Sequence, residues 1–145
     1  MRGGAGLVAS RALTREVAIV ASRIRIGRVE DFPTGAVTEV VVEGEKVIVV
    51  QDAEGLCAAH NKCPHLGLSL TSGPGGRTYT DGVITCPWHG SRFVVRSGEN
   101  LDWVTGVAGR SVPAWSRKVI SAGRKPAPLT TYSVVVDDGE VYLER

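Results

Sequence analysis

Two short pairs of cysteine and histidine constrain this chain more than any other feature. Cys63 and His65 stand in Cys-Pro-His-Leu-Gly, and Cys86 and His89 stand in Cys-Pro-Trp-His-Gly, with twenty residues between His65 and Cys86. Two thiols and two imidazoles suit zinc or an iron–sulfur centre, and they do not suit hard cations such as magnesium or calcium. The spacing therefore predicts a metal site that is built from two loops.

Proline and glycine punctuate both pairs in the same way. Pro64 and Pro87 follow the cysteines, where each fixes φ and removes a backbone donor. Gly67 and Gly90 follow the histidines, and we expect them to let backbone amides come close to whatever lies between the loops. Bridging sulfides accept hydrogen bonds from such amides, whereas a zinc ion has no sulfides. This favours an iron–sulfur centre, and a structural zinc site with the same ligands stays open as the alternative.

Taken together, Cys-Pro-His-Leu-Gly at 63–67 and Cys-Pro-Trp-His-Gly-Ser-Arg-Phe at 86–93 resemble the paired motifs of the Rieske family, specifically of its ferredoxins. In that family two cysteines and two histidines hold a [2Fe-2S] cluster. The resemblance implies an all-β fold, a Rieske-like antiparallel β-sandwich with a small cluster-binding subdomain. It also implies four ligands: Cys63 and Cys86 on the inner iron, His65 and His89 on the outer iron.

The resemblance also bears on the reduction potential. In high-potential relatives a serine hydroxyl bonds a bridging sulfide and a tyrosine bonds a ligand cysteine; by motif position these are Ser91 and Phe93, and Phe93 has no hydroxyl. Leu68 and Trp88 stand where those relatives have a disulfide over the cluster. The resemblance therefore implies the low-potential branch, at about −150 to 0 mV.

The function that the resemblance implies is electron transport without a substrate site of the chain's own. Three histidines in all leave too few for the mononuclear iron of a Rieske oxygenase large subunit. We expect a one-electron carrier, the ferredoxin component that passes electrons from a flavin-dependent reductase to a terminal oxygenase. The alternatives are a fixed subunit of a larger redox complex and the small subunit of a nitrite reductase. The latter ranks low because all four ligands are present.

Composition and charge agree with one domain. The 145 residues are 43% hydrophobic and 22% charged, and the net charge of +2 is uneven, because residues 1–25 and 101–126 each sum to +4. No basic strip is interleaved with aromatic residues, so we expect no nucleic-acid partner. Arg11 and Arg15 interrupt the first apolar run, so we expect no transmembrane segment. The missing disulfide and the unpaired Cys57 indicate a reducing compartment, the cytoplasm.

Hydrophobic alternation with glycine-containing turns predicts antiparallel hairpins. The expected strands are 24–27, 37–42, 46–51, 56–60, 83–85, 91–96, 130–136 and 140–143. We divide the chain into an N-terminal extension at 1–22, expected to be a tail or a short helix over 12–20, and a Rieske domain at 23–145. The domain contains the cluster-binding loops at 63–90 and an insertion at 101–130 that the ferredoxins of the family do not need.

Two further predictions concern single segments. In the insertion, Pro113 at a first turn and Gly123 as a stop enclose the apolar spacing of Trp115, Val119 and Ile120, which predicts one short helix. Cys57 and His60 repeat the Cys-x2-His spacing, but they lack the proline and glycine of the other pairs. A cysteine in an apolar strand is usually a small core residue, so we do not expect these two to bind metal. The glycine-rich run 67–82 is expected to be a loop.

Overall fold

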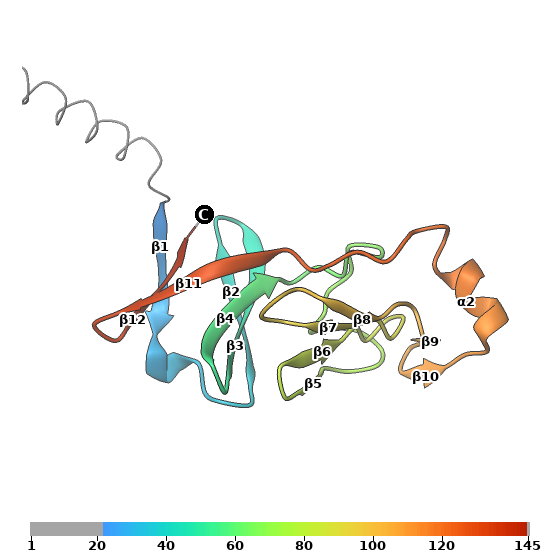
Figure 1. Cartoon of the computed structure of the whole chain (residues 1–145), viewed down its shortest axis with the longest axis horizontal. Coiled ribbons are helices and arrows are strands. Elements are labelled where there is room, and N and C mark those ends of the chain that lie inside the picture. Colours follow the sequence, from blue (N-terminus) through green and yellow to red (C-terminus); the bar gives the residue numbers. More distant parts are fainter. Residues whose placement is uncertain (1–21, 145) are drawn as a thin grey trace, which may run out of the picture.

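A computed structural model describes residues 22–144, and the predicted extension and helix before Ser22 lie outside these residues. The described chain is almost entirely β, which confirms the predicted fold class (Figure 1). The strands are β1 (Arg23–Arg28), β2 (Val37–Val42), β3 (Glu45–Asp52), β4 (Gly55–His60), β5 (Thr78–Thr80), β6 (Val83–Thr85), β7 (Arg92–Val94), β8 (Asn100–Asp102), β9 (Gly106–Val107), β10 (Arg110–Ser111), β11 (Thr131–Asp137) and β12 (Glu140–Glu144). A 3-10 turn, η1 (Val29–Asp31), and one helix, α2 (Ala114–Ile120), complete the described elements.

Six antiparallel strands form the large sheet, in the order β1-β12-β11-β4-β3-β2. Valine, isoleucine and alanine dominate β3 and β4, whose central residues are buried, so these strands lie in the middle of the fold. The register pairs Val50 with Cys57 and Val47 with His60. The strand β4 therefore ends directly before the first metal-binding loop, and the sheet fixes where that loop starts.

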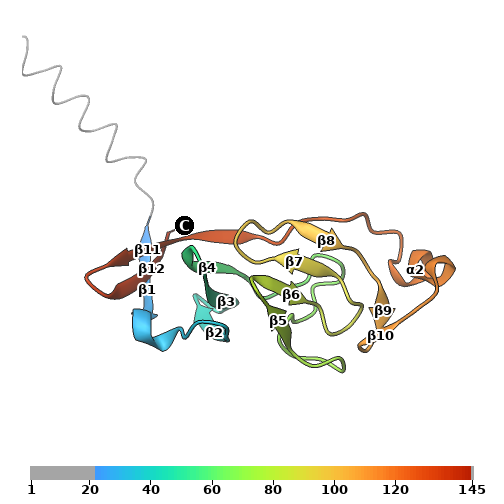
Figure 2. The same cartoon turned by 60° about the horizontal axis from the view of Figure 1, so that its bottom comes forward.

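The predicted small subdomain is a second sheet of short strands, in the order β5-β6-β7-β8. Figures 1 and 2 show this sheet beside the large one, with the β9-β10 hairpin and α2 at the end of the molecule far from β1. The long strand β11 returns the chain to the large sheet, where it pairs with β4 and β12. The fold thus places everything between β4 and β11 at one end.

Two apolar cores hold these parts together. One lies on the β1 and β12 side of the large sheet around Phe32, Val49 and Leu143. The other includes Ile48, Leu70, Ile84 and Phe93 together with both motif cysteines, and it joins the large sheet to the small one. The metal-binding loops are therefore anchored in the second core, because their cysteines are part of it.

Most predicted elements are confirmed, and two predictions are wrong in part. The run 67–82 is not all loop, because its last residues form β5 against β6. The insertion 101–130 contains the predicted helix, whose N-cap is Pro113, but it also contains most of β8 and the β9-β10 hairpin. No residue of α2 is fully buried: Trp115 and Val119 are exposed and Ile120 is half-buried.

Candidate metal centre

The two ligand loops are closed by the same pair of backbone hydrogen bonds. The Cys63 N–H donates to Leu68 O over 2.8 Å and the Gly67 N–H donates to Cys63 O over 2.8 Å. In the second loop the Cys86 N–H donates to Ser91 O over 2.8 Å and the Gly90 N–H donates to Cys86 O over 3.1 Å. Each cysteine therefore opens a tight turn of identical design. The two motifs are therefore similar in backbone conformation as well as in sequence.

The glycines serve these turns through their backbone conformation. Gly67 and Gly90 have φ of +73° and +76°, in the left-handed region that other residues rarely adopt. A Cβ atom on Gly90 would also lie 2.3 Å from Thr105 Oγ1, so the second loop has no room for a side chain there. The amides of both glycines are used inside their own turns, which differs from the expectation that they face the space between the loops.

Both motif cysteines are buried at 2% exposure and their thiols are hydrogen bonded to each other. That hydrogen bond from Cys63 lowers the pKa of Cys86 to about 6. The same bond, together with burial, raises the pKa of Cys63. The backbone amides of His65, Trp88 and His89 donate to the two sulfurs, and each favours the thiolate. The geometry thus favours one thiolate, on Cys86, with the proton kept on Cys63.

The two histidine rings lie next to each other but differ in exposure. Their centroids are 4.9 Å apart with the planes at 79°, and His65 is only 1% exposed whereas His89 is partly open. Burial, and secondarily the neighbouring His65, lower the pKa of His89. The lowered pKa of His89 favours the neutral form in which a histidine binds metal.

The Nε2 atom of His65 faces a carbonyl of the chain and not solvent. His65 Nε2 lies 3.0 Å from the Ser121 carbonyl, which accepts only, so Nε2 carries the proton. This tautomer leaves Nδ1 of His65 with the lone pair that a metal needs. The ring of Trp103 also packs edge-to-face against the His65 ring, and the two ring centroids are 5.4 Å apart. Neither contact has a local signal in the sequence.

The two positions beside the ligands that the sequence singled out are both fully buried. Ser91 is 0% exposed, and its Oγ accepts a hydrogen bond from the Val104 N–H over 2.9 Å. A hydroxyl that accepts in this way still has its own proton to donate. Phe93 in β7 is also 0% exposed and packs in the core.

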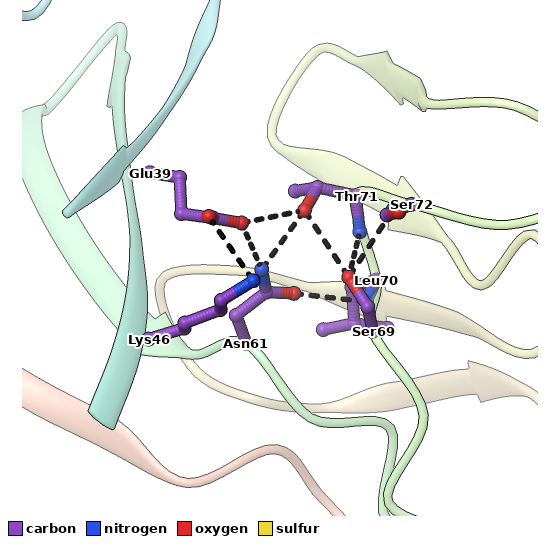
Figure 3. A network of polar contacts seen from close by, with 7 residues as sticks. All are labelled: Glu39, Lys46, Asn61, Ser69, Leu70, Thr71 and Ser72. Atoms are coloured by element: carbon purple, nitrogen blue, oxygen red, sulfur yellow. Dashed lines mark hydrogen bonds and ion pairs between the residues drawn. The ribbon is translucent and has the colours of Figure 1, made fainter. Parts of the chain in front are cut away.

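A polar network that the sequence did not reveal holds the first loop to the large sheet (Figure 3). Asn61 Nδ2 donates to Glu39 Oε2 over 2.6 Å and to Thr71 Oγ1 over 2.9 Å. Its Oδ1 accepts from the Leu70 N–H over 2.8 Å, and Lys46 lies 3.7 Å from the Glu39 carboxylate. Asn61 precedes Cys63 by two residues, so it clamps both ends of the segment that carries Cys63 and His65.

The Cys57 and His60 pair is not brought to this site. Cys57 is buried in the core, where desolvation raises its pKa to about 11, and the His60 ring meets Tyr132 edge-on at 6.5 Å. Within residues 22–144, no three His, Cys, Asp or Glu side chains converge on a point that could hold a single metal ion. The four motif residues instead form a thiol pair and an imidazole pair. This donor set fits a centre of two irons with two ligands each.

Comparison with known proteins gives the family. The sequence model of the Rieske [2Fe-2S] domain matches residues 22–113, which is more than half of the chain. The chain therefore belongs to the Rieske [2Fe-2S] domain family, and its cofactor is a Rieske-type [2Fe-2S] cluster. The zinc alternative is set aside by this result.

Individual relatives differ in how much of them the chain covers. Human apoptosis-inducing factor 3 is 36% identical over 75 residues, which are 52% of this chain, and the chain spans only about 12% of that relative's length. The ferredoxin subunit of 3-phenylpropionate/cinnamic acid dioxygenase from Photorhabdus laumondii is 26% identical over 84% of this chain and 93% of its own. Among solved structures, the ferredoxin of carbazole 1,9a-dioxygenase from Nocardioides aromaticivorans IC177 is 26% identical, with a TM-score of 0.59, over 85% of this chain and 97% of its own.

The relatives matched over nearly their whole length are thus Rieske-type ferredoxins, as the sequence predicted. Among the residues that the structure describes, none of the helices has the length and apolar character needed to cross a bilayer.

Proposed function

We propose that the chain is a one-electron carrier, a ferredoxin component that delivers electrons from a flavin-dependent reductase to a terminal oxygenase. Cys63 and Cys86 bind the inner iron of the cluster, and His65 and His89 bind the outer iron. The observation that carries this proposal is the pairing of two buried thiols with two adjacent imidazoles on matching loops. The ferredoxin relatives of dioxygenases support the carrier role, since they match this chain over 84% and 85% of its length.

The residues around the ligands have separable tasks. A bound [2Fe-2S] cluster supplies a site that accepts and returns a single electron. The amides of His65, Trp88 and His89 would stabilise added negative charge at the cysteine sulfurs, and the buried hydroxyl of Ser91 would donate to the cluster, as the family resemblance implies. The core around Leu70 and Ile84 keeps water from the cysteines, and the partly open His89 connects the site to the surface.

The redox state of the cysteines bears on the cellular compartment. All three are free thiols in the structure, so no disulfide closes over the site. A protein without that disulfide suits a reducing compartment, and we propose the cytoplasm.

One observation favours the alternative of a fixed subunit. The 36% identical relative is a far longer protein, of which the matched part is about 12%, so a domain of this kind also occurs inside a larger chain. In such an arrangement the same site passes electrons within one complex, and the basic insertion 101–126 is a permanent contact.

Spectroscopy of the purified protein tests the proposed function. We expect visible absorbance and, after reduction, the EPR signal of one [2Fe-2S] centre, and we expect His65→Cys or His89→Cys to alter both because a thiolate replaces an imidazole. The matched control His60→Cys places the same residue outside the site and should leave the spectra unchanged. A colourless protein that contains zinc, or a control that changes as much as the ligand variants, would contradict the assignment.

A further inference from the structure

The insertion covers one of the two histidines that would otherwise face a partner. His65 donates from Nε2 to the Ser121 carbonyl and packs against Trp103, and Trp103 itself donates from Nε1 to the Arg124 carbonyl over 3.1 Å. These contacts tie the segment after α2 across the site. His89 remains the partly open histidine, and the Thr105 and Gly106 amides of the same insertion donate to its carbonyl. The insertion therefore borders the exposed histidine and shields the other.

The helix of this insertion presents apolar side chains to solvent. Trp115 and Val119 are each 76% exposed, the highest values among the large hydrophobic residues of residues 22–144. They are four residues apart in α2 and so lie on one face, with Lys118 beside them. We call Trp115, Lys118 and Val119 the insertion face. Leu66 and Val107, each 43% exposed, lie on the segments that meet at the two histidines. Apolar exposure of this kind marks interaction sites, and tryptophan is enriched at their energetic centres.

The charge around the insertion face is positive and unneutralised. Residues 101–126 contain five basic residues and a single acid, Asp102, which already pairs with Arg92 over 2.8 Å. Across the described part of the chain, none of these five basic side chains forms an ion pair. A second copy of the chain docking symmetrically would set this positive segment against itself, which opposes self-association. The complementary occupant is negatively charged.

We propose that the insertion face is the docking surface for an acidic redox protein, which seats an apolar patch on Trp115 and Val119 and exchanges the electron through His89. This inference rests on the proposed electron-carrier function and names the chemistry of its partner. The contact combines a small apolar centre with steering by opposite charge, as transient redox encounters require. Coverage of His65 directs the exchange to His89, because the outer nitrogen of His65 is already bonded within the chain.

Stopped-flow reduction by an acidic electron donor tests the surface. The oxidised holo-protein is mixed with flavodoxin hydroquinone as the probe, at ionic strengths from about 20 to 300 mM. We expect the wild-type rate to fall at least about fivefold with rising salt, because the charges become screened. At low salt we expect Trp115→Ala and Lys118→Glu each to react at least about fivefold more slowly, the effect of losing one central interface residue.

Matched controls separate the docking surface from general effects. Arg23→Glu changes the net charge as much as Lys118→Glu, but it lies in β1 at the other end of the molecule (Figure 1), so it should stay within about twofold of wild type. Reduction by dithionite, a small reagent that needs no docking, should be equal in all variants. Rates with flavodoxin within about twofold of wild type for both insertion variants, or an equal loss in Arg23→Glu, would overturn the proposal.

Two other outcomes have distinct meanings. A wild-type dimer in light scattering that Trp115→Ala dissociates would assign the insertion face to a second copy of the chain and overturn an acidic partner. Absence of the cluster spectra in the wild-type protein would refute the proposed function itself. Normal spectra with salt-independent kinetics would refute only the docking surface.

Discussion

Asn61 offers the sharpest test of what holds the ligand loop in place. Its side chain is 3% exposed and makes three hydrogen bonds, to Glu39, Thr71 and Leu70. In Asn61→Ala the Leu70 N–H is left unpaired at a site with 0% exposure, which costs about 1–3 kcal/mol. The lost bond to the Glu39 carboxylate costs about 1.5–3 kcal/mol more, reduced because Glu39 keeps Thr71 and Lys46. We expect a total of about 3 kcal/mol.

The lost free energy makes it easier to open the loop that carries Cys63 and His65, because Asn61 holds both ends of that loop (Figure 3). A loss of about 3 kcal/mol raises the population of the open loop by about 100-fold. The assay is the decay of visible absorbance of the holo-protein in excess iron chelator, which traps each opening event. We expect Asn61→Ala to lose its colour about 100-fold faster than wild type.

The matched control removes the side-chain amide of another asparagine, which lies closer to the surface. Asn100 donates to the carbonyls of Arg92 and Asp102 from a half-buried position, so water can replace its bonds. We expect Asn100→Ala to lose the cluster within about threefold of the wild-type rate. A decay in Asn61→Ala within about fivefold of wild type would refute the reasoning, since the clamp would then not limit loop opening.

Three further predictions concern the loops and the stability of the fold. Gly90→Ala should abolish cluster incorporation, measured as iron per chain, because its Cβ would lie 2.3 Å from Thr105 Oγ1. Gly76→Ala is the control: Gly76 has a similar φ of +72° but open space around it, so this variant should still bind iron. Ser91→Ala should lower the reduction potential in voltammetry, because a buried donor is lost; an unchanged or higher potential would contradict this. The hydrogen bond from Arg96 lowers the pKa of Asp52. The wild-type protein should therefore be more stable than Asp52→Asn above about pH 4, and this advantage should vanish as the pH falls through the lowered pKa. The measurement is the difference between the urea midpoints of the two proteins at each pH. A difference that grows on acidification would contradict it.

Local patterns predicted the parts of this protein that local geometry determines. The strands Val37–Val42 and Val83–Thr85 were predicted at their observed bounds, because alternation and glycine turns depend on neighbouring residues only. The ligand loops belong to the same class, since each is closed by hydrogen bonds that span five residues or fewer. The strand β5 was not predicted, because three residues after a glycine-rich run gain their strand geometry from pairing with β6.

The surroundings of the site follow from contacts that no window of sequence contains. Ser121 reaches His65 across 56 residues through a carbonyl, a group that every residue has, so no residue type marks the contact. The apolar spacing of Trp115 and Val119 predicted the helix correctly, but it did not show that the structure leaves both side chains exposed. Within residues 22–144, Trp115 and Val119 stay exposed while the same insertion covers His65, and the proposed docking surface rests on this contrast. The motifs alone thus predicted the type of cofactor, whereas the side from which we propose that a partner docks depends on where the fold places the insertion.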